Sequence, residues 1–415
     1  MHKLFLKLLA IGLVTTSVAR AQDINGTWQG TIQSTPSQRV VLAAEKEHSG
    51  EERALLYRID APGHERIAHP ISSFAVHGNE VKFTADMGAG SFEGKLSADH
   101  SSIVGTWDDG KLSPLTFVKA KKNAAWRTDT GEHKTQFIEV EKGVRLEVLD
   151  WGGTGRPLIL IPGLADTAHV FDDFAPALAK SYHVYGITQR GAGESSSPVP
   201  TAANYNADRL GDDVVAVMDA LKLNKPILAG HSYGGAVLSS IGSRFPERIS
   251  GLIYIDAGYQ YALYDEAHGD LVIDALELCN TLEQTHLGQL PRTPEEINRL
   301  LGQTKQFEAE LQQRHDDLAT LPRPHPIQSP ILDATLDGEK KYTKIKVPVL
   351  AIFNVPHSAA FNRTMENQVQ AFRRQVPQAT IVLIANADHY LFEVKEQDVI
   401  SAINAFIEGL SARKP

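Results

Sequence analysis

Five residues near the middle of the chain, Gly230-His231-Ser232-Tyr233-Gly234, have the composition and spacing of a nucleophilic turn. An apolar run, residues 226–229, precedes them, and an apolar helix-like stretch, residues 236–249, follows. A serine hydroxyl is a weak nucleophile at neutral pH unless a base accepts its proton and a sharp turn exposes its oxygen. Glycines two residues before and after the serine leave room for such a turn. The pattern therefore predicts that Ser232 is a nucleophile held between a strand and a helix.

The elements that would position this turn alternate between strand and helix from residue 135 onward. Strands are expected at residues 136–140, 144–149, 158–161, 183–187, 252–255, 349–353 and 381–384. Helices are expected at residues 175–179, 210–221, 368–376 and 399–407, with a helical insertion at about 258–343. This alternation predicts a mostly parallel sheet that is covered by helices on both faces.

Three further motifs accompany the turn at 230–234. They are Ile161-Pro162-Gly163-Leu164, the loop Arg190-Gly191-Ala192-Gly193-Glu194-Ser195, and Asp388-His389 after the last expected strand. With these four motifs, and with the order serine, acid, histidine, residues 135–412, about two thirds of the chain, resemble the α/β-hydrolase superfamily with a helical cap. The resemblance implies an α/β-hydrolase domain over residues 135–415, with its cap at about 258–343.

The resemblance also implies a catalytic triad. Ser232 would attack a carbonyl carbon, and His389 would act first as general base and then as general acid. The family usually places an aspartate after the seventh strand, but residues 354–358 read Asn-Val-Pro-His-Ser and contain no carboxylate. Asp256, which ends the preceding strand, is therefore the candidate acid that orients the imidazole. The alternative is that Asp256 only caps the first helix of the insertion.

Backbone amides would complete such a site. The resemblance assigns an oxyanion hole to the amides of Leu164 and Tyr233, which would bind the charge that develops on a carbonyl oxygen. Pro162 replaces the histidine that is usual in this turn. Because the donors are backbone groups, the neighbouring side chains matter little for this role.

A few further side chains are candidates for lining a pocket, although each is also consistent with ordinary loop or packing positions. His357 and His389 do not have the spacing of a known metal site, so the sequence predicts no metal and no cofactor. The candidate pocket residues are His231, His357, Tyr259 and Tyr261.

The region before the hydrolase-like part has a different pattern. Residues 22–120 contain short alternating apolar runs separated by turn-forming residues, which predicts a small all-β domain, either a barrel or a sandwich. The element Gly-Thr-Trp occurs at residues 26–28 and again at 105–107, so the first and last strands are expected to pair. We interpret the tryptophans as core residues, with a ligand-binding or docking module as the alternative. Residues 121–134 are polar and predict a linker.

The first 21 residues predict an export signal. A basic start is followed by a short apolar stretch, residues 8–18, and by Ala19-Arg20-Ala21, which fits a signal-peptidase site. We therefore expect a periplasmic or secreted protein that is cleaved near Ala21, with no membrane-spanning segment in the mature chain. A retained anchor is the alternative, but the stretch is short for a bilayer.

Charge and cysteine content exclude some classes of partner and site. The 415-residue chain has a formal net charge of −9, and loss of a leader with three basic residues would bring it near −12. Such a balance argues against nucleic acid or an anionic membrane as a partner. Cys279 is the single cysteine, so neither an intramolecular disulfide nor a thiolate metal cage can form.

These features together predict an exported serine hydrolase that cleaves a small-molecule carboxylic ester, or a related acyl substrate, through an acyl-enzyme on Ser232. The same fold supports other reactions, so amidase, peptidase, lyase and carbon–carbon bond hydrolase activities remain alternatives. The missing acid after the seventh strand motivates another alternative, a non-catalytic binding protein on a decayed hydrolase fold. The sequence does not determine the oligomeric state.

Overall fold

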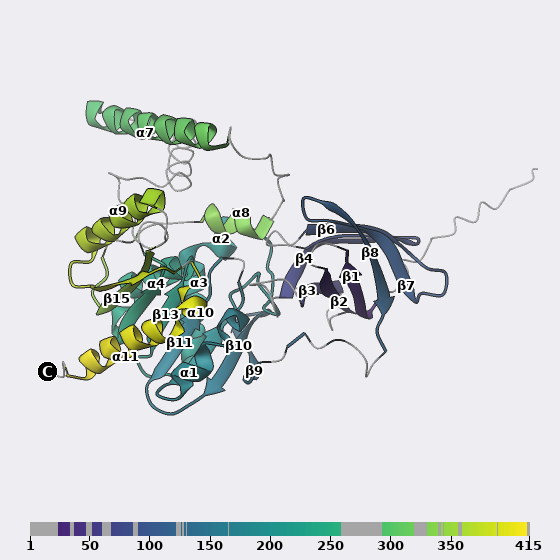
Figure 1. The fold of residues 1–415 in the computed structure, drawn as a ribbon, viewed down its shortest axis with the longest axis horizontal. Coiled ribbons are helices and arrows are strands. Elements are labelled where there is room, and N and C mark those ends of the chain that lie inside the picture. Colours follow the sequence, from purple (N-terminus) through teal and green to yellow (C-terminus); the bar gives the residue numbers. More distant parts are fainter. Residues whose placement is uncertain are drawn as a thin grey trace, which may run out of the picture.

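The computed structural model of the protein has an all-β body beside a larger α/β body (Figure 1). It describes residues 24–33, 37–46, 52–59, 68–85, 90–121, 126, 128–129, 131–164, 166–258, 293–318, 330–338, 342, 344–355, 359–387 and 389–412.

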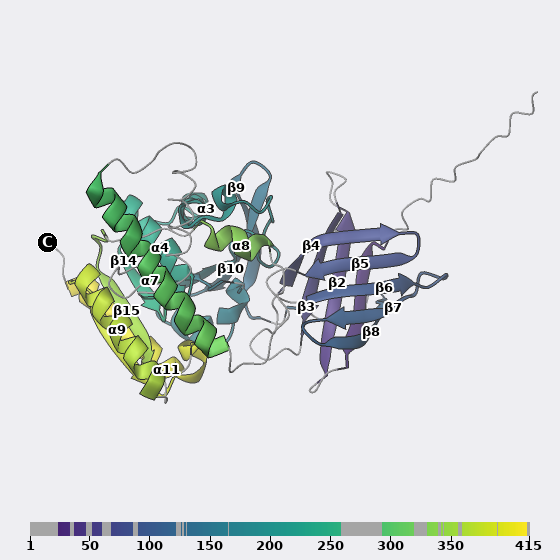
Figure 2. The same cartoon turned by 90° about the horizontal axis from the view of Figure 1, so that it is seen from above.

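The N-terminal body is a closed antiparallel barrel whose strands pair in chain order. Trp28 of the first strand pairs with Lys119 of the last, which closes the barrel as the repeated Gly-Thr-Trp element predicts. Figure 2 shows the later strands of the barrel crossing the first ones. The strands are β1 (Gly26–Ile32), β2 (Gln38–Lys46), β3 (Glu52–Arg58), β4 (Ala68–His77), β5 (Glu80–Ala85), β6 (Gly90–Leu96), β7 (Ser102–Asp108) and β8 (Leu112–Lys119).

Aromatic side chains fill the barrel. Alternate residues of each strand point inward, and Trp28, Trp107 and Phe117 are completely buried in one core cluster. Phe83 and Phe92 stack there with ring centroids 5.2 Å apart. An eight-stranded barrel is narrow enough for side chains to fill it, so the tryptophans serve as core residues.

The α/β body is built on one mixed sheet. Its strand order is β16-β15-β14-β13-β11-β12-β10-β9, in which β9 and β10 run antiparallel to their neighbours and the other pairs are parallel. The strands are β9 (Lys134–Glu141), β10 (Val144–Gly152), β11 (Pro157–Ile161), β12 (His183–Ile187), β13 (Ile227–His231), β14 (Gly251–Ile255), β15 (Val349–Val355) and β16 (Thr380–Ala385).

Helices cover both faces of this sheet because its strands are apolar on both sides. Helices α3, α4 and α9 pack with Ile159 and Ile161 on one face, whereas η1, α1 and α11 pack with Leu158 and Leu160 on the other. The helices are η1 (Ala168–Phe171), α1 (Ala175–Ala179), α2 (Ala202–Tyr205), α3 (Ala207–Ala220), α4 (Gly234–Arg244), η2 (Pro246–Arg248), α7 (Pro294–Leu318), α8 (Pro330–Leu336), α9 (Ala359–Gln375), α10 (Leu391–Val394) and α11 (Glu396–Ala412).

Helix α3 begins earlier than the apolar spacing predicts. Its first residue is Ala207 rather than Leu210, because the Asn206 side chain accepts a hydrogen bond from the Arg209 amide at 2.8 Å and caps the helix.

Helices α7 and α8 lie between β14 and β15 in the chain, where the helical insertion is expected. Within the described ranges, no helix combines the length and apolar character that a membrane crossing requires.

A hydrogen bond joins the barrel to the α/β body. The Tyr57 hydroxyl on β3 donates to Glu194 Oε1 at 2.7 Å, and Glu194 belongs to the glycine-containing loop after β12. The barrel therefore contacts a loop at the carboxyl ends of the parallel strands, where α/β sheets place their ligand sites.

Candidate active site

Ser232 lies at the turn between β13 and α4. Its φ angle is +50°, in the left-handed region that non-glycine residues rarely adopt. A Cβ atom added to Gly230 would lie 2.8 Å from the Gly234 carbonyl oxygen, and one added to Gly234 would lie 2.7 Å from the Ile161 carbonyl oxygen. The glycine spacing of the sequence is therefore required by close backbone packing around a strained turn.

Gly235 makes the closest approach at this turn, and Gly235→Ala is expected to destabilise the fold. The added methyl carbon would lie 2.2 Å from the carbonyl oxygen of Ala257, a backbone atom that cannot rotate away. Overpacking of this kind should lower the free energy of unfolding by about 2–3 kcal/mol, measured by urea denaturation. Gly409→Ala is the matched control, because a Cβ atom there meets no atom within 4 Å on an exposed face of α11. The control should stabilise the chain by about 0.5–1 kcal/mol, and an equal loss in both variants would contradict the packing argument.

His389 and Asp256 come together although they are far apart in sequence. His389 Nδ1 lies 2.6 Å from Asp256 Oδ2, and the carboxylate side chain is only 9% exposed. A carboxylate accepts only, so Nδ1 carries the proton and Nε2 keeps its lone pair. That tautomer is the one a general base requires.

Asn354 is a site residue that the sequence analysis noted only for lacking a carboxylate. It lies near the end of β15, and its Nδ2 donates to Asp256 Oδ2 at 2.7 Å. Its backbone amide lies 3.3 Å from the other carboxylate oxygen. Asn354 thus holds the carboxylate of Asp256 from the strand end where the family usually places its acid. That coincidence of position was the available signal in the sequence.

His231 lies beside His389 and is completely buried. Its Nε2 donates to the His389 carbonyl oxygen at 3.0 Å, and the two ring centroids are 4.6 Å apart. Burial, followed by the nearby charge of His389, lowers the pKa of His231 to about 3, so this ring stays neutral. The pocket role of His231 stays a prediction, and the buried ring packs against His389 and bonds its backbone carbonyl.

The amides proposed as the oxyanion hole belong to two residues that border one small cavity. Leu164 and Tyr233 both line it, together with Asp166 and Thr335. A Cβ atom added to Gly163 would lie 2.8 Å from Ser232 Cβ, so the turn after β11 packs directly against the serine. The cavity thus adjoins the serine and includes Thr335, a residue of the helical insertion.

Asp166 is a second residue that the sequence analysis missed. Its side chain is 3% exposed, and it accepts a hydrogen bond from the Tyr390 hydroxyl at 3.2 Å. Burial raises the pKa of Asp166 to about 7, although the bond from Tyr390 opposes the rise. A buried carboxyl group beside the cavity thus titrates near neutral pH.

The loop after β12 is fixed by a buried arginine. Arg190 makes a bidentate contact with Asp213 of α3, with both N–O distances 2.6 Å, and an ion pair with Glu141 of β9 at 2.9 Å. Such paired hydrogen bonds make a buried charge tolerable and hold the loop in one geometry. The first residue of the predicted Arg-Gly-x-Gly-x-Ser motif therefore anchors the loop that borders the cavity.

The remaining predicted residues, Tyr259, Tyr261 and His357, lie outside the described residues, as does Asp388. Their proposed pocket roles stay predictions.

A mostly parallel sheet that presents a serine on a strained strand-to-helix turn, with a histidine–aspartate pair at the ends of strands of the same sheet, defines a protein of the nucleophile-elbow class. A family model described as the alpha/beta hydrolase fold matches residues 156–396. The chain belongs to the alpha/beta hydrolase family and is an enzyme of that superfamily.

Curated relatives are similar to the same part of the chain at low identity. The chain is 22% identical over 274 residues to 2-(acetamidomethylene)succinate hydrolase of Mesorhizobium japonicum, covering 62% of this chain and 90% of the relative. It is 26% identical over 282 residues to the AB hydrolase superfamily protein YisY of Bacillus subtilis, covering 65% and 98%. It is 32% identical over 128 residues to 2-hydroxymuconate semialdehyde hydrolase of Pseudomonas sp. strain CF600, covering 30% and 44%.

A solved structure is similar over the same region. The crystal structure of E-2-(acetamidomethylene)succinate hydrolase superposes with a TM-score of 0.45 at 21% identity, covering 66% of this chain and 99% of that one.

Proposed function

We propose that this enzyme is a serine hydrolase that cleaves a carboxylic ester, with Ser232 as nucleophile, His389 as base and Asp256 as the acid that orients it. The observation that carries the proposal is the 2.6 Å contact between His389 Nδ1 and Asp256 Oδ2, together with a φ of +50° at Ser232, whose backbone amide bonds Ile255, the residue before Asp256. A serine in a strained backbone conformation, together with an oriented imidazole, is typical of a catalytic site.

The proposed reaction has two halves. Ser232 Oγ forms a bond to the ester carbonyl carbon as its proton passes to His389 Nε2, and the amides of Leu164 and Tyr233 bind the resulting oxyanion. The tetrahedral intermediate collapses, the alcohol leaves with the proton from His389, and an acyl-enzyme remains. Water then gives a proton to His389, attacks the acyl carbon, and releases the acid and the serine.

Esters are the proposed substrates because an alkoxide leaves more readily than an amine anion, and the proton that His389 holds completes its departure as the alcohol. A panel of p-nitrophenyl esters of increasing acyl length tests this. We expect a burst of p-nitrophenol equal to the enzyme concentration, followed by slower turnover. Complete absence of p-nitrophenol release from every ester, by a folded sample, would exclude the ester proposal.

A second candidate reaction is hydrolysis of a non-ester carbonyl compound. The observation that favours it is the likeness to relatives named 2-(acetamidomethylene)succinate hydrolase and 2-hydroxymuconate semialdehyde hydrolase. Assaying those two compounds beside the ester panel separates the candidates, because the preferred substrate should have a kcat/KM at least about tenfold higher.

Export is part of the proposal. Residues 1–21 have the order of a signal peptide, with a basic start, an apolar stretch and a small-residue cleavage site. They lie outside the described residues. Determining the N-terminal sequence of the protein recovered from the periplasm tests export, and a start near Gln22 is expected.

Asp166→Asn is expected to change the response of the enzyme to pH. The folded-state pKa of Asp166 is about 7, above the ordinary value of 3.8. Between these two pH values the unfolded chain has already lost the proton that the folded chain keeps, so the free energy of unfolding falls as the pH rises from about 4 to about 7. Asparagine keeps the shape without the charge. Measured by urea denaturation at pH 8, the variant should be roughly 2–4 kcal/mol more stable than the wild type, and the two should converge near pH 4.

The same substitution should alter the rate at high pH. An ionised Asp166 beside the proposed oxyanion hole opposes a developing negative charge, so wild-type kcat/KM should fall above about pH 7. The fall should be absent in Asp166→Asn and retained in Asp398→Asn, which changes an exposed aspartate on α11. A similar alkaline decline in all three proteins would disprove the role of Asp166.

A further inference from the structure

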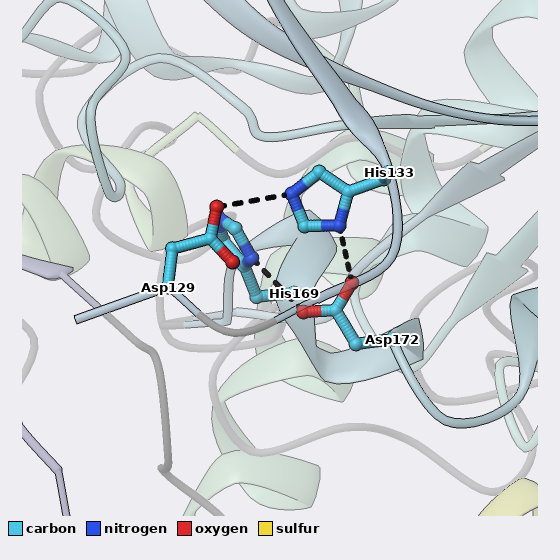
Figure 3. A group of neighbouring side chains, drawn as sticks. All are labelled: Asp129, His133, His169 and Asp172. Carbon is cyan, nitrogen blue, oxygen red and sulfur yellow. Dashed lines mark hydrogen bonds and ion pairs between the residues drawn. The ribbon is translucent and has the colours of Figure 1, made fainter. Parts of the chain in front are cut away.

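Four side chains at the start of the α/β body point toward one another (Figure 3). They are distant from Ser232 in the sequence. Asp129 and His133 precede β9, in the segment predicted as a linker, whereas His169 and Asp172 lie in and directly after η1. One ligand atom from each residue can be chosen so that all four lie within 4.8 Å of one another. The proposed reaction uses none of them.

His133 is the most informative member of this cluster. Its side chain is 0% exposed, yet neither ring nitrogen makes a hydrogen bond of acceptable geometry within the described residues. Its Nδ1 lies 2.8 Å from Asp172 Oδ1, and its Nε2 lies 3.3 Å from Asp129 Oδ2. A buried imidazole surrounded by carboxylate oxygens, but poorly aligned for hydrogen bonding, is unusual unless another group completes the site.

Outer residues orient the other two members. His169 Nε2 lies 3.3 Å from Glu147 Oε1, and its Nδ1 lies 3.1 Å from Asp172 Oδ2. Carboxylates only accept, so both nitrogens donate in the metal-free protein; a metal ion at Nδ1 would displace that proton while Glu147 keeps the proton on Nε2. The Trp151 indole N–H donates to Asp172 Oδ1 at 3.2 Å. A carboxylate behind a histidine, and a hydrogen bond to a coordinating carboxylate, are the usual supports of metal ligands.

The charge of the cluster favours a cation. Asp129, Asp172 and Glu147 bring three carboxylates to two imidazoles, so the group stays net negative even when both rings are protonated. Asp172 and Glu147 are both buried, and buried charge requires compensation. Two imidazoles and two carboxylates suit zinc, which takes four ligands at about 2.0–2.2 Å with ligand atoms roughly 3.3 Å apart. With one ligand atom taken from each residue, all four atoms lie within 4.8 Å of one another, so the widest pair has to close by about 1.5 Å to reach that spacing.

We propose that Asp129, His133, His169 and Asp172 bind one zinc ion. Four protein ligands leave no open position for substrate, so the ion has a structural role. It would fasten the segment that follows the barrel to η1. Helix η1 begins four residues after Leu164, whose amide is proposed to bind the oxyanion. Gly131 allows this close packing, because a Cβ atom there would lie 2.4 Å from His133 and 2.7 Å from Asp172.

Zinc binding by the untagged, chelator-treated full chain tests the proposal. Calorimetric titration with Zn²⁺, and metal analysis after dialysis, should both give one ion per chain. Thermal unfolding should give a higher Tm for the zinc-loaded protein. His133→Gln should weaken binding by at least about 100-fold, and Asp129→Asn by at least about tenfold. Asp129 is 46% exposed on its side chain, so its substitution leaves the buried packing intact.

His183→Gln is the matched control. His183 also contacts an aspartate of the same sheet, with its Nε2 2.9 Å from Asp150 Oδ1, but it lies outside the cluster. Its substitution should leave zinc stoichiometry and affinity unchanged. Less than about 0.1 zinc per folded wild-type chain, or equal affinity in the wild type, Asp129→Asn and His183→Gln, would overturn the proposal.

Discussion

Ser232→Ala is expected to lower kcat on the best ester substrate by a factor of roughly 10⁵–10⁶ while KM changes little. The substitution removes the oxygen that forms the acyl bond and leaves the binding surface nearly intact. The reaction that remains relies on the oxyanion hole and substrate binding alone. The φ of +50° strains serine and alanine alike, so the substitution adds no backbone strain and alanine keeps the geometry of the turn.

Labelling with a fluorophosphonate probe gives a readout that does not depend on knowing the substrate. The wild type should label at one site per chain, and Ser232→Ala should not label. Ser250→Ala is the control, because Ser250 donates to the Lys225 carbonyl at the surface, remote from His389. A folded wild type that does not label would favour the alternative of a binding protein on a hydrolase fold.

The serine turn could be predicted because its requirements are local. Five consecutive residues contain both the nucleophile and the glycines, and the structure shows the backbone contacts that require Gly230 and Gly234. The alternation of strands and helices was predictable for the same reason, since each element reveals its own period. The predicted boundary was wrong where a side chain outside the apolar pattern sets it, as Asn206 does at the start of α3.

The supporting residues could not be predicted because their contacts are long-range. Asn354 bonds Asp256 across 98 positions, and Tyr390 bonds Asp166 across 224. Neither pair has a recognisable spacing, and only the register of the parallel strands and the loops at their ends brings them together.

The four residues of the proposed zinc site illustrate the same limit. Asp129 and His133 lie in a segment whose polar composition predicts only a linker, and His169 and Asp172 form a common i, i+3 pair. The histidines that the sequence offers for a metal, His357 and His389, lack the spacing of a known site, so the sequence predicts none. The charge and burial that motivate the proposal exist only when the linker folds back onto η1.

Asp256→Asn is expected to lower kcat by a factor of about 10³–10⁴. His389 Nδ1 donates to Asp256 Oδ2 at 2.6 Å, and Asn354 Nδ2 donates to the same oxygen at 2.7 Å. An asparagine at 256 has one oxygen and one amide group, and the Asn354 backbone amide faces the other carboxylate oxygen at 3.3 Å, so either orientation sets the new amide group against a donor. If the amide group faces the ring, His389 must accept at Nδ1 and carry its proton on Nε2, which is the wrong tautomer for a base.

Two further variants separate this explanation from general damage. Asp150→Asn removes the charge from another aspartate–histidine pair of the sheet, with His183, and should leave kcat within about twofold. Asn354→Ala removes one donor but keeps the carboxylate, so kcat should fall only about tenfold. If Asp256→Asn kept more than about a third of the wild-type kcat, the orienting acid would have to be another group, despite the contact that Asp256 makes with His389. A large loss in Asp256→Asn with a small loss in Asn354→Ala would instead mean that the acid acts from the end of β14, with Asn354 holding it from β15.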